Sequence, residues 1–243
     1  MSWFVKSFGA RYRQLYSHRD EAEAERTLAL LEPSSGWSAR LVLDLACGAG
    51  RYGRALRRRG ATPIGLDLSP VLLAEARSWD PSSMLLRADM RKIPLSSGSV
   101  DDCLSMFTSF GYFDTVSEHA LLAAEMARVS RGRIVVDIPN PVALQRNLVP
   151  RSERELDGFL LREIRWLKTQ PAQVCKRMEL VDASGVVDEE YEESVMLFER
   201  SQLVEFFEPH GFALRRCHGS YAGEDFVRDE SPRQICVFAL GEA

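Results

Sequence analysis

The sequence predicts an α/β fold in which helices cover both faces of a mainly parallel sheet. Two observations support this prediction. Apolar segments of strand length alternate with segments of helical periodicity between residues 41 and 137, and such alternation builds right-handed βαβ units. A glycine-rich turn, with Gly48 and Gly50, joins the first strand to its helix. In open α/β sheets, turns of this kind lie beside ligands at the carboxyl ends of the strands.

Length and composition indicate one elaborated globular domain with an insertion. The chain has 243 residues, of which 45% are hydrophobic and 27% charged, and its formal net charge is −4. This acidic balance predicts no general attraction to nucleic acid or anionic lipid. The five cysteines are scattered and lack zinc-type spacing, so we expect reduced thiols and no metal site. Without a signal-like or membrane-length apolar run, the chain is expected to be cytoplasmic, as a monomer or a homodimer.

The amino-terminal segment is predicted to form two helices. Aromatic residues at positions 4, 8, 12 and 16 share one helical face. A second helix, rich in alanine and glutamate, is predicted from Asp20 to Leu31 and ends before Pro33. We expect residues 1–32 to act as a helical lid over the site.

The alternating units place polar side chains at one edge of the sheet. Strands are predicted at 41–45, 62–66, 84–87, 100–107 and 133–137, and helices at 51–59, 70–78 and 116–130. Asp44, Asp67, Asp89 and the segment 107–113 each end or follow a strand. Because the carboxyl ends of parallel strands meet at the same edge, these residues are expected to form one site.

The hydrophobic pattern changes in the carboxyl-terminal part of the chain, and the last two predicted strands belong to the main sheet again. Between residues 155 and 198, three alternating segments are separated by turn signals, which predicts a three-stranded antiparallel insertion within 150–198. A helix with Ser201 as its N-cap is expected to stop at Gly211. Two further strands, 212–217 and 234–240, complete the sheet.

The glycine-rich turn fits two classes of cofactor. Gly48, Gly50 and Gly53 satisfy the G-x-G-x-x-G spacing of a dinucleotide site, with Asp67 at the downstream acidic position. Asp44, however, would lie close to the pyrophosphate of NAD or FAD and repel it. S-adenosylmethionine carries an ammonium and a sulfonium instead of phosphates, so a carboxylate beside the turn attracts it. The sequence therefore favours S-adenosylmethionine.

The residues from about 40 to 140 resemble the motifs of the class I S-adenosylmethionine-dependent methyltransferases. Residues 42–50 resemble the first motif, 65–69 the second, 88–90 the third, and 101–113 the fourth-strand position. The resemblance implies a Rossmann-like, seven-stranded sheet with an antiparallel last strand, formed by residues 33–149 and 199–243. It also implies that Asp67 binds the ribose hydroxyls and Asp89 the adenine amino group.

The candidate cofactor-binding residues follow from these motifs, from the segment 107–113 and from the amino-terminal element: Tyr16, Asp44, Ala46, Gly48, Gly50, Arg51, Asp67, Leu68, Asp89, Met90 and Phe107. Some have alternative structural roles. Asp44 can cap the glycine turn, and Asp89 can act as a turn former. Asp67 can cap the next helix, although Ser69 fills that position better.

The sequence contains fewer features that identify acceptor-binding residues than features that identify cofactor-binding residues. Candidate acceptor-binding residues are Tyr12, Phe110, Tyr112 and Tyr221. Methyl transfer by in-line displacement requires alignment more than a strong base, so no catalytic residue is assigned. His18, Tyr112 and His218 are candidates by type if the acceptor must lose a proton.

We expect methyl transfer to a small molecule. The alternatives are RNA methylation, NAD-dependent oxidoreduction at the glycine turn, and cofactor binding without catalysis.

Overall fold

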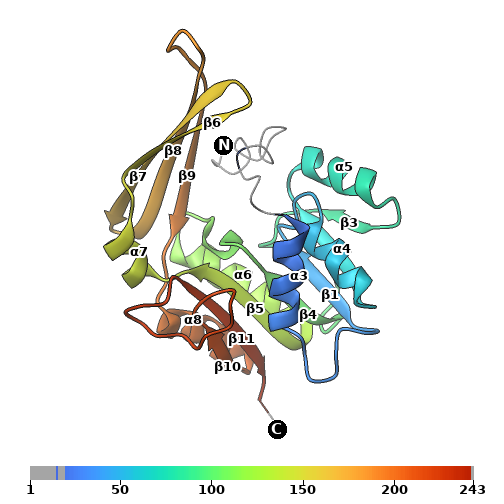
Figure 1. Ribbon diagram of the computed structural model, residues 1–243. Helices are drawn as coiled ribbons and strands as arrows, with labels where there is room; N and C mark the ends of the chain where they lie inside the picture. The colour runs from blue at the N-terminus through green and yellow to red at the C-terminus, as the bar shows by residue number, and fades with distance from the viewer. Residues whose placement is uncertain (1–14, 16–19, 242–243) are drawn as a thin grey trace.

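The main sheet determines the architecture of the molecule (Figure 1). A computed structural model describes residue 15 and residues 20–241. The sheet has seven strands in the order β10-β11-β5-β4-β1-β2-β3. Their bounds are β1 Leu41–Leu45, β2 Thr62–Asp67, β3 Met84–Arg87, β4 Val100–Ser105, β5 Ser130–Pro139, β10 Phe212–His218 and β11 Arg233–Leu240. β11 is antiparallel to both of its neighbours, β10 and β5, which confirms the predicted fold class.

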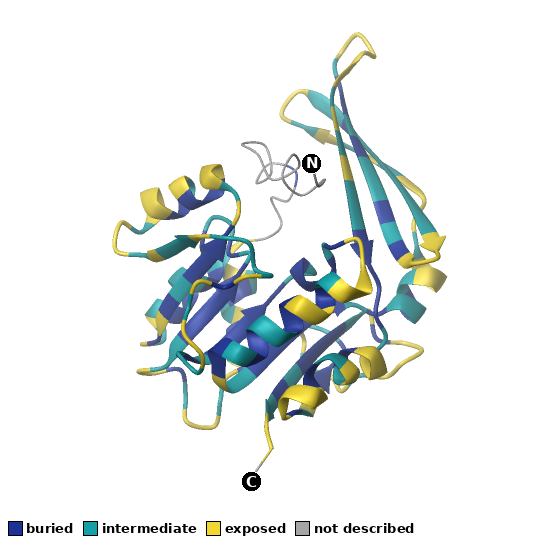
Figure 2. Ribbon diagram, turned by 180° about the vertical axis from the view of Figure 1, so that it is seen from behind, coloured by how far each residue is buried: buried dark blue, intermediate teal, exposed yellow. Residues whose placement is uncertain are grey.

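Helices cover the sheet on both faces, and each face has its own hydrophobic core. The helices are α3 Glu21–Leu30, α4 Arg51–Arg58, α5 Pro70–Trp79, α6 Val116–Val129, α7 Pro141–Asn147 and α8 Arg200–Phe207, with 3-10 turns η1 Ser109–Gly111 and η2 Glu208–His210. Successive strand residues point to opposite faces. Val42 therefore packs with Leu28 of α3 and Leu56 of α4, whereas Leu43 belongs to the core that includes Leu122 of α6. Figure 2 shows the buried strands between these helices.

The insertion forms a four-stranded antiparallel sheet, so the expectation of three strands was wrong. Its strands are β6 Arg151–Leu156, β7 Phe159–Thr169, β8 Ala172–Val181 and β9 Val187–Met196, paired in that order. β6 was missed because its sequence is largely charged. Its signal was the turn that follows it, since Asp157 and Gly158 both have positive φ, 48° and 84°, as a two-residue hairpin requires.

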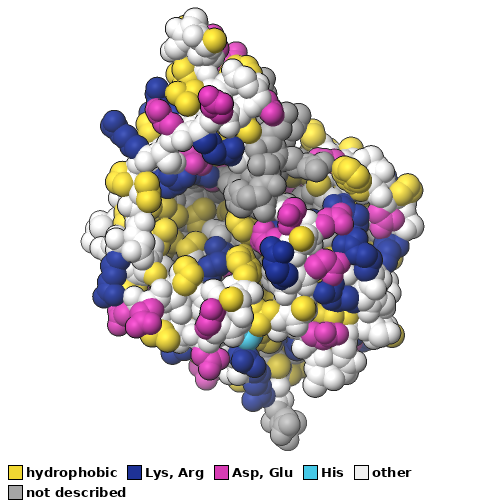
Figure 3. Space-filling view, in the orientation of Figure 1, with side chains coloured by type: hydrophobic (Ala, Val, Ile, Leu, Met, Phe, Trp, Pro, Cys, Tyr) yellow, Lys and Arg dark blue, Asp and Glu magenta, His cyan; other side chains and the backbone are white. Residues whose placement is uncertain are grey.

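One face of the second sheet is directed towards the main domain. At its base, a Cβ added to Gly111 of η1 would lie 2.6 Å from Cγ1 of Val195 on β9, so the two backbones pack closely there. Further along, Leu15 packs with Leu161, Met178 and Leu180. Figure 3 shows the surface hollowed between the second sheet and the main sheet, with hydrophobic side chains in the hollow.

Several predicted boundaries also change. β4 ends at Ser105 rather than at residue 107, and β5 runs from 130 to 139. The N-cap of α8 is Glu199 rather than Ser201, because Glu199 and Gln202 form a reciprocal capping box. The helix expected from Asp20 to Leu31 is present as α3, with Asp20 as its N-cap. The helix expected around residues 4–16 lies outside the described residues, apart from Leu15.

Within residues 20–241, none of the helices is both long and apolar enough to span a lipid bilayer.

Candidate functional site

A cavity of about 230 Å³ opens at the carboxyl ends of β1 and β4. It is bordered by the glycine turn, by the start of α3 and by the turn that follows β4. The lining residues are Asp20, Glu21, Asp44, Leu45, Ala46, Cys47, Gly48, Ala49, Arg51, Tyr52, Arg54, Trp79, Met106, Phe107, Ser109 and Tyr112. This is the edge of the sheet where the sequence placed the site.

The glycine turn has an unusual backbone that brings main-chain groups to the cavity. Ala46, Gly48 and Gly50 have φ angles of 54°, 54° and 78°. Gly50 is the N-cap of α4, and a Cβ there would lie 3.2 Å from Cβ of Ala76. Glycine is therefore required at this position by both conformation and space. The turn presents the free N–H groups at the start of α4 to the cavity side.

Asp44 is the most informative residue of the site. It lies near the end of β1 between Gly65 of β2 and Leu104 of β4, and it is 2% exposed. Its Oδ2 atom has no hydrogen-bond partner among the described residues. Burial raises the pKa of this carboxyl to about 7, although the charge of Arg51 opposes the shift. A buried acceptor without a partner is costly unless a ligand supplies the donor.

Arg51 lies beside this carboxylate and is held from three sides. Its Nη1 atom is 3.1 Å from Oε2 of Glu23 on α3. Its guanidinium lies 4.7 Å from the ring centre of Tyr52 and 5.6 Å from that of Phe107, within the range of cation–π attraction. The cavity therefore has a fixed positive group next to the start of α4, suited to an anionic carboxylate.

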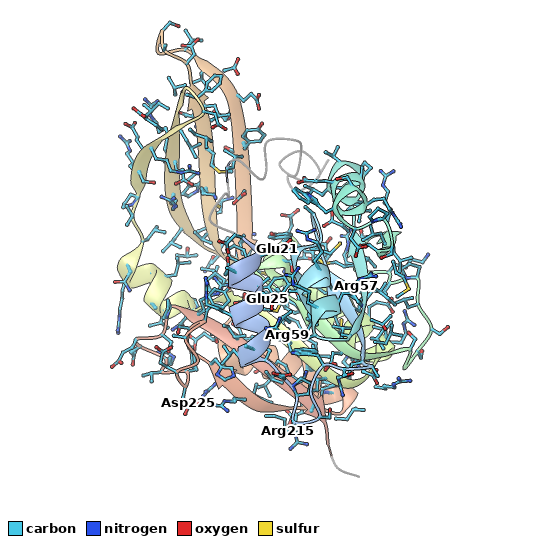
Figure 4. The ribbon with its side chains drawn as sticks, turned by 45° about the vertical axis from the view of Figure 1, so that its right-hand side comes forward. Glu21, Glu25, Arg57, Arg59, Arg215 and Asp225 are labelled. Atoms are coloured by element: carbon cyan, nitrogen blue, oxygen red, sulfur yellow. The ribbon has the colours of Figure 1, made fainter. Side chains whose placement is uncertain are left out.

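Three arginines of the basic run that follows Arg51 pair with glutamates of α3. Arg54 and Arg58 contact Glu21 at 2.5 and 3.1 Å, and Arg59 is paired with Glu25. Figure 4 shows Glu21 and Glu25 on α3 beside α4, which carries Arg57 and is followed by Arg59. These arginines therefore attach α3 to the core, and Asp20 and Glu21, at the start of α3, line the cavity.

The turn after β4 forms the opposite wall. Phe107 and Thr108 both have positive φ, 53° and 76°, and the short turn η1 follows. Phe107, Ser109 and Tyr112 line the cavity. Ser109 is anchored by hydrogen bonds to the Met106 carbonyl at 3.0 Å and to Oγ of Ser105 at 2.9 Å. This wall is mainly aromatic and neutral.

The predicted ribose and adenine ligands have other contacts in this structure. Asp67 is buried, and its carboxylate accepts the N–H groups of Gly48 and Ser69, each at 2.8 Å. Burial raises the pKa of Asp67. Asp89 is paired with Arg91, and that bond lowers the pKa of Asp89. Of the predicted cofactor set, Asp44, Ala46, Gly48, Arg51 and Phe107 line the cavity, whereas Gly50, Asp67, Leu68, Asp89 and Met90 do not.

The predicted acceptor residues are dispersed. Tyr112 lines the cavity, but Phe110 is fully buried and packs edge-on against Phe198 and Phe206. The backbone reversal at Phe107 and Thr108 directs Phe110 into the core, which the sequence does not show. His218 is 3% exposed, and its Nδ1 atom contacts the Gly223 carbonyl. Tyr12, Tyr16 and His18 lie outside the described residues.

Two functional candidates were missed by the sequence analysis. Asp137, at the end of β5, is completely buried and accepts the Phe107 N–H group at 2.9 Å. Arg233 of β11 donates to its other oxygen at 2.6 Å. They are 96 positions apart in the chain, so only the pairing of β11 with β5 brings them together. The described residues contain no group of three or more potential metal ligands.

Comparisons with known proteins show what the chain is similar to. The family described as Methyltransferase domain matches residues 42–132. A malonyl-[acyl-carrier protein] O-methyltransferase of Pectobacterium atrosepticum is 36% identical over 37% of this chain and 34% of its own. A dTDP-3-amino-3,4,6-trideoxy-alpha-D-glucopyranose N,N-dimethyltransferase of Streptomyces venezuelae is 32% identical over 50% of this chain and 51% of its own. The chain thus aligns with a third to a half of these relatives.

The fold comparison extends over almost the whole chain. The CcbJ methyltransferase of Streptomyces caelestis has a TM-score of 0.77 and 18% identity, and the match covers 91% of this chain and 90% of that one. Residues 42–132 match the methyltransferase-domain family, and the chain as a whole has the fold of solved methyltransferases. The expected cofactor is S-adenosylmethionine, as the resemblance implied. The relatives differ in acceptor, and one of them acts on ribosomal RNA, so the family does not define the acceptor.

The cavity fits this cofactor and not a dinucleotide. Asp44 offers a buried carboxylate for the ammonium, and Arg51 offers a cation for the carboxylate of the methionine part. Asp20 and Asp44 would disfavour a pyrophosphate, whereas Glu21 is already paired with arginines of α4. The predicted preference over NAD and FAD therefore has a structural basis.

Proposed function

We propose that this methyltransferase transfers the methyl group of S-adenosylmethionine to a small-molecule acceptor by in-line displacement. The observation that supports it most is the Oδ2 atom of Asp44, which has no hydrogen-bond partner in the part of the chain that the structure describes. Asp44 is buried at the edge of a cavity that also presents Arg51 and the glycine turn. S-adenosylmethionine supplies a methyl group that is already activated by its sulfonium. The residues of the chain then need to bind, align and exclude water.

Each wall of the cavity has a role in this proposal. Asp44 takes the ammonium and Arg51 the carboxylate, while Asp67 takes the ribose hydroxyls after small shifts of its present contacts. Asp89 is proposed to reach the adenine amino group, with Leu68 and Met90 flanking the ring. Phe107 and Tyr112 bound the space beyond the sulfur, where the acceptor atom must approach, and an aromatic wall there stabilises positive charge.

The proposal also assigns a separate role to each segment of the chain. We assign cofactor binding to residues 33–149 and 199–243, and closure of the acceptor space to residues 1–32 and 150–198. The second sheet supports this assignment because Val195 meets η1, which joins the cavity residues Ser109 and Tyr112. A space closed by added elements suits a small acceptor better than a polymer.

Two experiments test the proposal. Calorimetry should detect micromolar binding of S-adenosylhomocysteine and no binding of NADH; the reverse result would reject the cofactor assignment. The chain is then incubated with S-adenosylmethionine and a panel of carboxylic acids, amino sugars and phenols. A mass gain of one methyl on a panel member supports a small acceptor. Methylation of RNA only, with salt-sensitive retention on RNA, would reject it.

A further inference from the structure

The turn after β4 has a backbone conformation that needs support. Phe107 and Thr108 are consecutive non-glycine residues in the left-handed region, with φ of 53° and 76°. A side chain is sterically disfavoured there, and such conformations persist only where the surroundings hold them. Phe107 nevertheless lines the cavity, so the position of its ring depends on whatever fixes this turn.

One residue fixes both positions of the turn. Oδ2 of Asp137 accepts the Phe107 N–H group at 2.9 Å, and the main-chain oxygen of Asp137 accepts the Thr108 N–H group at 2.8 Å. Arg233 donates to Oδ1 of Asp137 at 2.6 Å and to Oγ1 of Thr108 at 3.3 Å. Its guanidinium also lies 5.3 Å from the Phe107 ring centre. The support is therefore directed at the backbone and at the ring.

The same carboxylate also holds the loop between β10 and β11. The Tyr221 hydroxyl donates to Oδ2 of Asp137 at 2.6 Å, and the Tyr221 ring lies 5.4 Å from the Arg233 guanidinium. Asp137 is 0% exposed, so water does not compete for these bonds. The loop and the cavity turn thus share one anchor.

We propose that Asp137 is a positioning residue for methyl transfer. It holds the Phe107–Thr108 turn in its left-handed conformation, which places the Phe107 ring beside the reacting methyl group. Through Tyr221 it locks the loop of residues 219–232 to that turn. The proposal rests on the function proposed above, but it assigns a role to residues that neither the motifs nor the cavity lining identifies.

A matched control lies at the other end of the sheet. Asp102 is also 0% exposed and is also paired with arginine, at 2.5 Å to Arg40 and 2.6 Å to Arg133, but it does not line the cavity. Replacing either aspartate by asparagine removes a buried charge from an arginine pair. A merely structural role for Asp137 would make both variants behave alike.

The experiment compares Asp137→Asn with Asp102→Asn at equal folded fraction. For Asp137→Asn we expect kcat to fall roughly 10- to 100-fold, because small misplacements of reacting groups have effects of this size. The acceptor KM should change less than about threefold, while S-adenosylhomocysteine binds with a Kd at most about tenfold higher. Asp102→Asn should keep kcat and Kd within about twofold of the original chain.

A rescue variant makes the test specific to the turn. Glycine adopts positive φ without steric penalty, so adding Thr108→Gly to Asp137→Asn should recover part of the lost kcat. If Asp137→Asn does not fold, the charge-balanced pair Asp137→Asn with Arg233→Gln replaces it, with and without Thr108→Gly. Equal kcat losses in the two aspartate variants, or no recovery of kcat by glycine in a folded chain, would overturn the proposal.

The outcomes also separate this proposal from the proposed function. If the unaltered chain binds no S-adenosylhomocysteine, the function fails and the role of Asp137 fails with it. If the unaltered chain binds and methylates, while Asp137→Asn keeps full kcat, only the positioning role fails.

Discussion

Each end of the main sheet buries an aspartate, but only one of these two carboxylates is paired with arginines. Near the amino end of β4, Asp102 is fully buried and neutralised by Arg40 and Arg133. Near the carboxyl end of the neighbouring strand β1, Asp44 is 2% exposed, and its Oδ2 atom has no partner within the described part of the chain. The first end is complete without a ligand. The second keeps an acceptor without a partner among these residues, which the donor of a bound ligand would satisfy.

The comparison shows how stability and function are separated within one fold. A buried charge destabilises the folded chain unless it is paired. At the amino end all partners of the ion pairs belong to the chain, so these pairs contribute to folding only. At the carboxyl end, in the function proposed above, the cofactor would supply the pairing partner, and folding tolerates the penalty of a carboxylate without one. Asp137 lies between these cases, because its carboxylate is paired with Arg233 and also supports the cavity turn.

The largest effect on folding is expected at the amino end. Asp102→Ala leaves Arg40 and Arg133 without their shared partner. We expect the free energy of unfolding to fall by about 3 kcal/mol, the lower end for broken buried ion pairs, because both guanidinium side chains keep partial exposure, 21% and 17%. Urea denaturation measures the loss. The affinity for S-adenosylhomocysteine should stay within about twofold, and a parallel loss of affinity would show that the two ends are not independent.

The opposite result is expected at Asp44. Asp44→Asn removes the charge that meets the cofactor ammonium, so binding of S-adenosylhomocysteine should weaken by about 2 kcal/mol, in the range for hydrogen bonds to charged groups. Calorimetry measures this change.

The unfolding free energy of Asp44→Asn should not fall, because the substitution also removes a buried ionisable group whose pKa is raised to about 7. A variant that loses stability and keeps its affinity would contradict the comparison and assign Asp44 a structural role.

The sequence predicted the residues at the carboxyl end of the sheet better than it predicted the residues that support the cavity turn. Asp44, Gly48 and Arg51 are adjacent in sequence to a strand end and a helix start, so local patterns were sufficient to place them at the edge where the cavity lies. Asp137 and Arg233 meet because β11 inserts antiparallel between β5 and β10. Their contact depends on strand order, for which the two isolated residues carry no local signal.

The misplaced residues share a related cause. Phe110 was expected at the acceptor, but two consecutive left-handed residues precede it and reverse the chain into the core. A positive φ at Phe107 and Thr108 is not suggested by their residue types. By contrast, the missed strand β6 was signalled by Asp157-Gly158, so that error came from giving its charged composition more weight than its turn.

A smaller effect on binding is expected at Asp67. Asp67→Ala should weaken the binding of S-adenosylhomocysteine by about 1–2 kcal/mol, because the ribose hydroxyls are neutral partners whereas the ammonium of the Asp44 site is charged. The variant should also lose some stability, since Asp67 accepts the N–H groups of Gly48 and Ser69. Calorimetry and urea denaturation on the same preparation measure both changes.

Asp67→Asn separates the two roles, because its amide oxygen can still accept one of those N–H groups. We expect it to retain more stability than Asp67→Ala while binding the cofactor product less tightly than the original chain. An affinity unchanged in both variants would reject the ribose assignment.

The smallest effect is a pH dependence that Asp44 alone should produce. Its folded-state pKa of about 7 lies above the usual value for an aspartate. In the ligand-free chain, the stability linked to its protonated form is therefore fully present below about pH 4 and is lost as pH rises through about 7. Binding has the opposite sign, because the ammonium requires the ionised carboxylate. Affinity for S-adenosylhomocysteine should rise by at most about tenfold between pH 6 and pH 8, which is about 1.4 kcal/mol.

Calorimetry in buffers of different ionisation enthalpy measures this effect directly, as proton release on binding near pH 7. The release should disappear in Asp44→Asn and persist in Asp102→Asn, because Asp102 is already paired with two arginines before the ligand arrives. If Asp44→Asn still releases the proton, another group in the cavity titrates on binding. The unpaired carboxylate would then not be what distinguishes the two ends of the sheet.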